Sequence, residues 1–261
     1  MNNLSQSLWV EFLKARRSKM PVLTALGFSL APIVGGLFMI ILRDPEFARR
    51  AGLISAKAQI AAGSADWQTY LGLLAQAEAI GGIILFGLIA TWVFGREFAD
   101  RTVKDWLALP TARAAIVASK LIVVAAWTLA LSALNFGIGL IIGNAVALAP
   151  APIEIFWRGG ITLAITALLT IALVTPIVFF ASAGRGYLPP MGITILLIIF
   201  AQILAAMGWG EYFPWSVPAL FAGVAGEHTA QLGASSFVIV ALTSVAGIIA
   251  TFVWWERADQ Q

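Results

Sequence analysis

The chain has 261 residues, of which 60% are hydrophobic and 11% are charged, and its formal net charge is +3. Soluble domains carry roughly 25% charged residues, so this composition excludes a soluble globular domain and indicates a polytopic membrane protein. The small net charge gives no argument for nucleic-acid binding. The absence of cysteine excludes disulfides and zinc–thiolate sites, and a single histidine cannot form a multi-histidine metal site.

Residues 1–19 predict an amphipathic helix that lies in the membrane interface. One helical face collects apolar side chains: Leu4, Leu8, Phe12 and Ala15. Four basic residues follow between positions 14 and 19, where they can reach lipid headgroups. A disordered tail is the alternative interpretation.

The first apolar run, residues 20–42, predicts a transmembrane helix with a kink at Pro32. Its 23 residues exceed the roughly 7–15 residues of a signal-peptide core. Residues 43–66 are polar, and a surface helix is expected over 45–62 because Gly52 alone interrupts that stretch.

The second predicted span runs from Trp67 or Leu71 to Phe94 and carries Glu78 near its outer end. An ionisable group costs about 2.5–3.5 kcal/mol at the centre of the bilayer and less near its edge. The carboxylate therefore either lines a substrate path or extends to the outer interface, and we favour the second interpretation.

Residues 95–113 form a long polar interruption between the second and third spans. Thr102 and Asp105 have the spacing of a helix capping box. Pro110 disfavours helix at the residue before it, so the element is expected to end there. Thr111 is expected to cap the helix that enters the next span.

The short helix in this segment has an apolar face. Val103, Trp106 and Leu107 recur at i, i+3 and i+4. An ordinary basic loop is the simpler interpretation, but a loop without a partner has no need of an apolar face toward water. The segment therefore predicts a docking helix at the membrane surface.

The pattern of this stretch resembles that of permease subunits of type-2 ABC transporters. The matching positions are Glu97-Phe98, Thr102, Trp106-Leu107, Leu109-Pro110, Thr111, Arg113 and Lys120. The residue before the threonine is often glycine in that family, and here it is Arg101. Arg101 in place of glycine affects the turn before the predicted short helix, and the resemblance to the family holds.

The resemblance implies that residues 95–113, which we call the coupling segment, dock on a cytoplasmic ABC ATPase subunit. The implied coupling residues are Glu97, Arg101, Thr102, Lys104, Asp105, Trp106, Leu107, Pro110 and Arg113. ATP and Mg²⁺ would then be bound by the partner, and no cofactor by this chain. It also implies an exporter in a prokaryotic inner membrane that pairs with a second permease, either another copy of this chain or a different permease. The homodimer is favoured, and the first and fifth spans are the implied interface.

The third and fourth spans are expected at about 114–147 and 159–181, with a bend at Thr175-Pro176. Asn135 in the third span lines a path or bonds across helices. A polar stripe repeats every four residues in the fourth span: Thr162, Thr166 and Thr170. Such stripes more often pack against a partner helix than line a cavity. A place for Thr166 on the translocation path is therefore the less favoured interpretation.

The fifth and sixth spans are expected at about 188–207 and 236–255. Between them, residues 208–235 are aromatic and broken by proline and glycine. The apolar stretch within them is too short to cross a bilayer. We therefore predict an interfacial or re-entrant segment, with a short helix over 214–221; an aromatic belt at the outer interface is the alternative.

Charge placement predicts the orientation of these six spans. With the N-terminus inside, the inner segments hold eleven of the sixteen basic residues: Lys14, Arg16, Arg17, Lys19, Arg96, Arg101, Lys104, Arg113, Lys120, Arg185 and Arg257. The outer segments hold the other five: Arg43, Arg49, Arg50, Lys57 and Arg158. Both termini and the coupling segment are therefore predicted to be cytoplasmic.

The sequence thus predicts an all-α polytopic protein, with residues 1–261 as one permease domain of six transmembrane helices. It has no catalytic motif that we recognise; the Gly-Lys pair of a P-loop is absent. An intramembrane serine protease would need a base beside a serine in the membrane, and His228 is predicted in an outer loop. A scaffold subunit that transports nothing is the other alternative.

Overall fold

The computed structural model describes residues 3–50, 52, 64–100, 102, 111–224 and 232–257, and every regular element among them is helical. The elements are α1 (Asn3–Arg17), α2 (Met20–Arg43), α3 (Pro45–Arg50), α4 (Trp67–Ala99), α6 (Arg113–Ala145), α7 (Ile153–Ala183), α8 (Leu188–Ala206), η1 (Gly210–Tyr212), η2 (Pro214–Ser216), α9 (Val217–Phe221) and α10 (Ala234–Arg257). Six of them are long and apolar enough to cross a membrane: α2, α4, α6, α7, α8 and α10. The predicted all-α protein with six transmembrane helices is confirmed.

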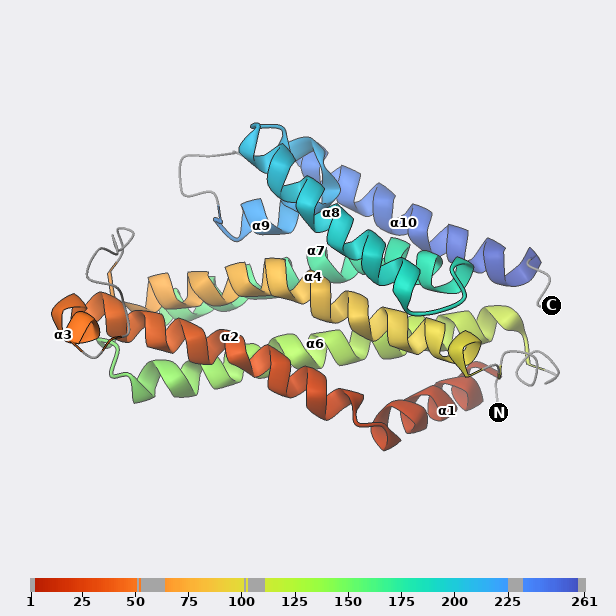
Figure 1. Cartoon of the computed structure of the whole chain (residues 1–261), viewed down its shortest axis with the longest axis horizontal. Coiled ribbons are helices and arrows are strands. Elements are labelled where there is room, and N and C mark those ends of the chain that lie inside the picture. The colour runs from red at the N-terminus through yellow and green to blue at the C-terminus, as the bar shows by residue number, and fades with distance from the viewer. Residues whose placement is uncertain are drawn as a thin grey trace.

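The long helices run along the longest axis of the molecule (Figure 1). The end of α4, the start of α6 and the end of α10 lie near α1, and we call this the α1 end of the bundle. The short helix α3 lies at the opposite end. The expected helix over 45–62 is described only as Pro45–Arg50, because residues 51 and 53–63 lie outside the described residues.

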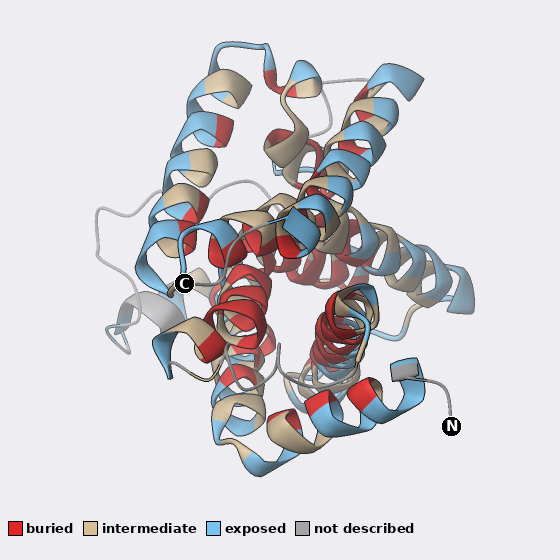
Figure 2. Ribbon diagram, turned by 90° about the vertical axis from the view of Figure 1, so that its right-hand side faces the viewer, coloured by how far each residue is buried: buried red, intermediate tan, exposed pale blue. Residues whose placement is uncertain are grey.

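The centre of the bundle is formed by α4, which packs most extensively against α7. In the most apolar stretch of each helix, 56% of the residues of α4 and 50% of those of α6 are buried. The corresponding shares are 17% for α8 and 22% for α10. Figure 2, viewed along the bundle from the α1 end, shows this contrast between buried inner helices and largely exposed outer ones. The exposed apolar faces of α8 and α10 suit hydrocarbon, since lipid replaces the protein core there.

The helix α7 continues without interruption through Pro176, and α2 does so through Pro32. At the first site, Thr175 Oγ1 donates a hydrogen bond to the Ser244 carbonyl of α10 over 2.9 Å. Gly247 of α10 lies against the same place, where an added Cβ would stand 2.5 Å from the Pro176 nitrogen. Pro176 thus lies at a close contact between α7 and α10. The kink predicted at Pro32 and the bend predicted at Thr175-Pro176 stay predictions.

The helix α1 packs against α6 and begins and ends close to the predicted limits of 1–19. The predicted apolar face is divided in the structure. Leu4 and Phe12 are exposed, whereas Ala15 is buried together with Glu11 and Ser7, four and eight residues earlier. One stripe therefore faces the protein and another faces outward, and the position of α1 in the membrane interface stays a prediction.

The segment over 208–235 between α8 and α10, which we call the outer segment after its predicted side, forms the short helices η1, η2 and α9, none of which is long enough to cross. It folds back onto the bundle: Ser216 Oγ donates to the Ala201 carbonyl of α8 over 3.0 Å, and Val217 is fully buried. The expected short helix over 214–221 is present, while residues 225–231 lie outside the described residues. Its depth in the bilayer stays a prediction.

Candidate functional site

The structure describes both ends of the coupling segment. α4 continues through Glu97 to Ala99, and the Thr102 amide donates to the Glu97 carbonyl over 2.9 Å. α6 begins at Arg113 on the other side. The predicted coupling residues between these ends lie outside the described residues: Arg101, Lys104, Asp105, Trp106, Leu107 and Pro110. The predicted docking helix therefore stays a prediction.

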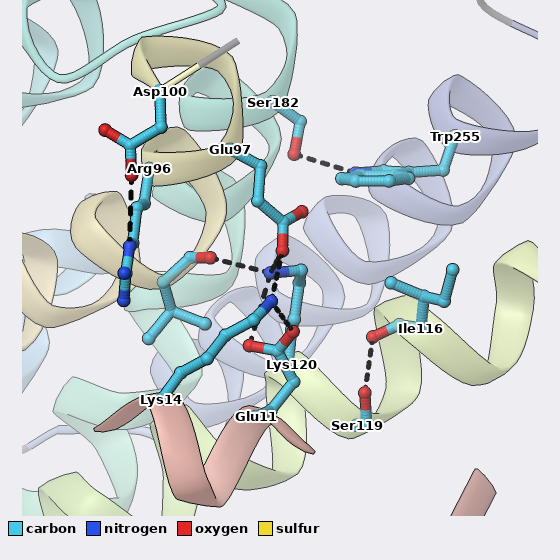
Figure 3. A network of polar contacts seen from close by, with 11 residues as sticks. Glu11, Lys14, Arg96, Glu97, Asp100, Ile116, Ser119, Lys120, Ser182 and Trp255 are labelled. Carbon is cyan, nitrogen blue, oxygen red and sulfur yellow. Dashed lines mark hydrogen bonds and ion pairs between the residues drawn. The ribbon is translucent and has the colours of Figure 1, made fainter. Parts of the chain in front are cut away.

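Glu97 lies in a buried network of four charged side chains, which we call the charge network (Figure 3). Its members are Glu11 and Lys14 of α1, Glu97 of α4 and Lys120 of α6. Glu97 Oε1 accepts from Lys14 Nζ over 2.7 Å and from Lys120 Nζ over 3.0 Å. Glu11 pairs with Lys14 over 2.8 Å and with Lys120 over 3.3 Å. The four residues thus join three helices at the α1 end.

The burial of this network is unusual for charged groups. Lys120 is 1% exposed, and Glu97 and Glu11 are 3% and 4% exposed. Lys120 Nζ also donates to the Val93 carbonyl of α4 over 2.9 Å. Two ammonium groups and two carboxylates cancel in formal charge, and such balance is needed because an unpaired buried charge is costly.

Arg113, at the other end of the coupling segment, holds the end of α10. Its Nη1 donates to the carbonyls of Trp255 and Glu256, each over 3.2 Å. The last carbonyls of a helix lack partners within the helix, and a cation there is favourable. Trp255 is itself fully buried, and its Nε1 donates to Ser182 Oγ of α7 over 3.0 Å. Arg113 therefore links the start of α6 to α10.

The expected cap at Thr111 is wrong. The N-cap residue of α6 is Ala112, and no side chain accepts a hydrogen bond from the first turn. The start of α6 is instead fixed by the contact of Arg113 with α10.

The sequence patterns did not single out Glu11, and they placed Lys14 among the basic residues that reach lipid headgroups, whereas the structure pairs it with Glu11 and Glu97. Lys120 appeared there as part of the motif but not as a coupling residue. A signal for Glu11 exists in hindsight: it lies on the stripe Ser7, Glu11, Ala15, so its carboxylate faces the protein. A carboxylate on the buried face of an amphipathic helix needs a cation from another element.

A second polar cluster lies within the spans. Glu78 of α4 is fully buried and accepts hydrogen bonds from two side chains of α6, Ser132 Oγ and Asn135 Nδ2, the latter over 3.1 Å. The favoured interpretation that Glu78 extends to the outer interface is wrong. Glu78 follows the first residue of α4 by eleven positions, roughly 16 Å along the helix axis, and its carboxylate is turned toward α6.

The structure joins Glu78 and Asn135 through a hydrogen bond, whereas the Thr166 hydroxyl bonds within its own helix. Thr166 is buried on α7, and its hydroxyl donates to the Thr162 carbonyl of its own helix over 2.8 Å. A cavity of about 230 Å³ lies elsewhere, between α4, α8 and the outer segment; its lining includes Ala79, Ile83, Ile198, Gln202 and Trp215. None of the three predicted path residues lines this cavity.

Trp215, which lines this cavity, has a buried indole nitrogen: its Nε1 has no hydrogen-bond partner among the described residues. Those residues also contain no group of three or more acidic or histidine side chains that could hold a metal ion. The chemistry of the described part of the chain is thus that of charge pairing and helix contact.

Comparison with known proteins gives two matches. The sequence model described as "ABC-2 family transporter protein" matches residues 7–201, about three quarters of the chain. The bacitracin transport permease protein BCRB of Bacillus licheniformis is 27% identical over 179 residues, which cover 68% of this chain and 85% of that protein. The matched region of the family model includes the whole charge network and the coupling segment.

Proposed function

Because the chain belongs to the ABC-2 transporter family, we propose that it is the membrane-spanning permease subunit of an ATP-driven exporter. In this proposal a separate cytoplasmic ATPase binds ATP and Mg²⁺ and hydrolyses the nucleotide, and this chain forms the translocation path. The absence of a P-loop motif from the sequence fits that division. The proposed location is a prokaryotic inner membrane, with both termini cytoplasmic.

The observation that carries this proposal is the anchoring of the coupling segment at both ends. Glu97 on one side and Lys120 on the other belong to the same buried charge network. Arg113, between them, holds the last turn of α10. A partner that grips the segment differently in two nucleotide states would therefore act on α1, α4, α6 and α10 together.

The cargo is the next question. The relative named above is called a bacitracin transport permease. This makes peptide antibiotics the first class of cargo to test. The cavity beside α8 is the candidate path within one copy, and its open side along α8 leaves room for a second copy of the chain to complete it.

The test of coupling is a substitution in the predicted docking helix. Buried aromatic residues at interfaces commonly cost about 2 kcal/mol or more on truncation, so Trp106→Ala should weaken ATPase association about thirtyfold. Pro110→Ala should allow the docking helix to fuse with α6, which keeps some association but lowers coupled hydrolysis. The measurements are co-purification of the ATPase and cargo-stimulated ATP hydrolysis in proteoliposomes.

The matched control is Trp209→Ala, which removes an exposed tryptophan from the outer segment. This variant should keep wild-type association. Full association and full coupled hydrolysis in Trp106→Ala would remove the main support for the proposal. Association without any cargo-dependent hydrolysis in the wild-type complex would favour a scaffold subunit instead.

The proposed homodimer uses α2 and α8, the first and fifth spans. Leu37 of α2 is 42% exposed, and Ile198 of α8 lines the cavity. Cysteines at these positions should crosslink between copies in the membrane, whereas Leu168→Cys, on the exposed face of α7, should not. Efficient crosslinking at Leu168 together with failure along both α2 and α8 would refute this interface.

A further inference from the structure

A groove of about 630 Å³ opens between α1 and α6, which we call the α1 groove. Its walls are almost wholly apolar and include Leu8, Trp9 and Phe12 of α1 and Ile122, Ala126 and Trp127 of α6. The indole nitrogen of Trp127 already has a hydrogen-bond partner, because Nε1 donates to Thr24 Oγ1 of α2 over 3.2 Å. The groove therefore offers contact surface rather than hydrogen bonds to whatever fills it.

The groove opens on an exposed apolar surface of the chain. Trp9 is 64% and Phe12 55% exposed, and Ile122 of α6 is also exposed. From Ile122 to Ala130 the groove follows α6 for eight residues, roughly 12 Å. This is the length of a substantial part of one acyl chain, and an apolar surface in a membrane is covered by acyl chains unless protein covers it.

The rim of the groove carries positive charge. Arg16 lines it, and Arg17 and Lys19 follow at the end of α1 and in the turn to α2. All three are exposed, and none makes an ion pair with any residue in the described part of the chain. The nearest acid in the sequence, Glu11, is buried and already paired with Lys14 and Lys120.

From this arrangement we propose that the α1 groove is a binding site for an anionic phospholipid. The acyl chain lies along α6, and the phosphate lies at Arg16, Arg17 and Lys19. A zwitterionic headgroup brings its own cation to a rim that carries Arg16 and has two further exposed cations within three residues of it, so a net negative headgroup is preferred. Each basic residue near the surface should contribute about fivefold, the equivalent of ~1 kcal/mol. The site requires only that the chain is embedded in a membrane, so it does not depend on transport.

The experiment uses the absence of cysteine from the chain. Ala126→Cys is labelled with a small fluorophore in the full-length protein, which is reconstituted into phosphatidylcholine bilayers. Brominated phosphatidylglycerol or brominated phosphatidylcholine with the same chains is added as the quencher. The control position is Leu242→Cys on α10, which is 64% exposed and lies in mid-helix.

The expected result is a preference for phosphatidylglycerol of at least fivefold at position 126 and none at position 242. Arg16→Gln combined with Arg17→Gln and Lys19→Gln should reduce the preference at 126 to less than twofold, and Arg16→Gln alone should give an intermediate value. Arg158→Gln on α7, at the opposite end, should leave the preference unchanged.

Equal preference at positions 126 and 242 would overturn the proposal, because ordinary boundary lipid would explain it. A preference that survives the triple substitution would also overturn it. Absence of quenching at 126 by either lipid would mean that protein, such as a second copy of the chain, covers the groove.

Discussion

Substitution of Lys120 by methionine is the most direct test of the charge network. Methionine keeps an unbranched chain of similar size and removes only the ammonium group. That group lies 3.0 Å from Glu97 Oε1 and 3.3 Å from Glu11 Oε2, and the residue is 1% exposed. After the substitution, two buried carboxylates share the single cation of Lys14, so the site carries a net negative charge.

The expected magnitude follows from this unbalanced charge. Removing one partner of a buried ion pair typically costs about 3–5 kcal/mol. For chains of this size each kcal/mol lowers Tm by roughly 2–4 °C, so Lys120→Met should lower Tm by roughly 6–20 °C. The measurement is thermal unfolding of the purified protein in detergent, with the loss of monodisperse protein as the readout.

A double substitution separates charge balance from packing. Lys120→Met combined with Glu97→Gln leaves the neutral pair of Glu11 and Lys14, so the double variant should be more stable than the sum of the two single changes predicts. Coupling of about 0.5–3 kcal/mol is expected for residues in one network. Asp100→Asn is the control, because the pair of Arg96 and Asp100 is exposed and contributes about 1 kcal/mol or less.

Two outcomes would count against this reasoning. Lys120→Met with a Tm within about 2 °C of wild type, a shift that corresponds to roughly 1 kcal/mol or less, would mean that water or relaxation replaces the ammonium group. Strict additivity of the two substitutions would mean that Glu97 and Lys120 do not act as a pair.

Two further predictions concern topology and helix packing. A cysteine at Pro152, in the turn between α6 and α7, should react with an impermeant thiol reagent from outside the cell, whereas one at Lys104 should react only from inside; strong outside labelling at Lys104 would invert the orientation. Gly247→Ala should lower stability by about 1–3 kcal/mol, since its Cβ would stand 2.5 Å from the Pro176 nitrogen. Ile249→Ala on the exposed side of α10 should have little effect, and equal Tm values for the two variants would contradict the close contact.

The sequence was sufficient for the number of spans because each crossing requires a long apolar run, and hydropathy records such runs directly. It was less accurate for helix ends. α7 begins at Ile153, six residues before the expected start at 159, and includes the charged Glu154 and Arg158. Hydropathy marks the part of a helix that lies in hydrocarbon, whereas the hydrogen-bonded helix continues into the polar region beyond it.

The site was predicted only in part, for a different physical reason. The resemblance to the permease family pointed to Glu97 and Arg113, which flank the predicted docking helix. The partner of Glu97 on α1, Lys14, is 83 residues away in the chain. No periodicity within a single sequence specifies such a pairing, because it depends on how α1 packs against α6. Glu78 was misplaced for the same reason: its partners lie 54 and 57 residues later, on another span.

Under the proposed coupling, the placement of these charges would pass a movement of the short coupling segment on to several membrane helices. The charge network and Arg113 bind the two ends of the coupling segment to α1 and α10, while α7 packs extensively against both α4 and α10. A displacement of the segment cannot be absorbed by the start of α6 alone, because a shift there would separate Lys120 from two buried carboxylates. Moving the connected helices together keeps every buried charge paired, whereas moving one of them leaves a charge unpaired in a buried site. Movement of a single helix therefore costs more free energy than movement of the connected helices together, and this difference favours collective movement at the α1 end.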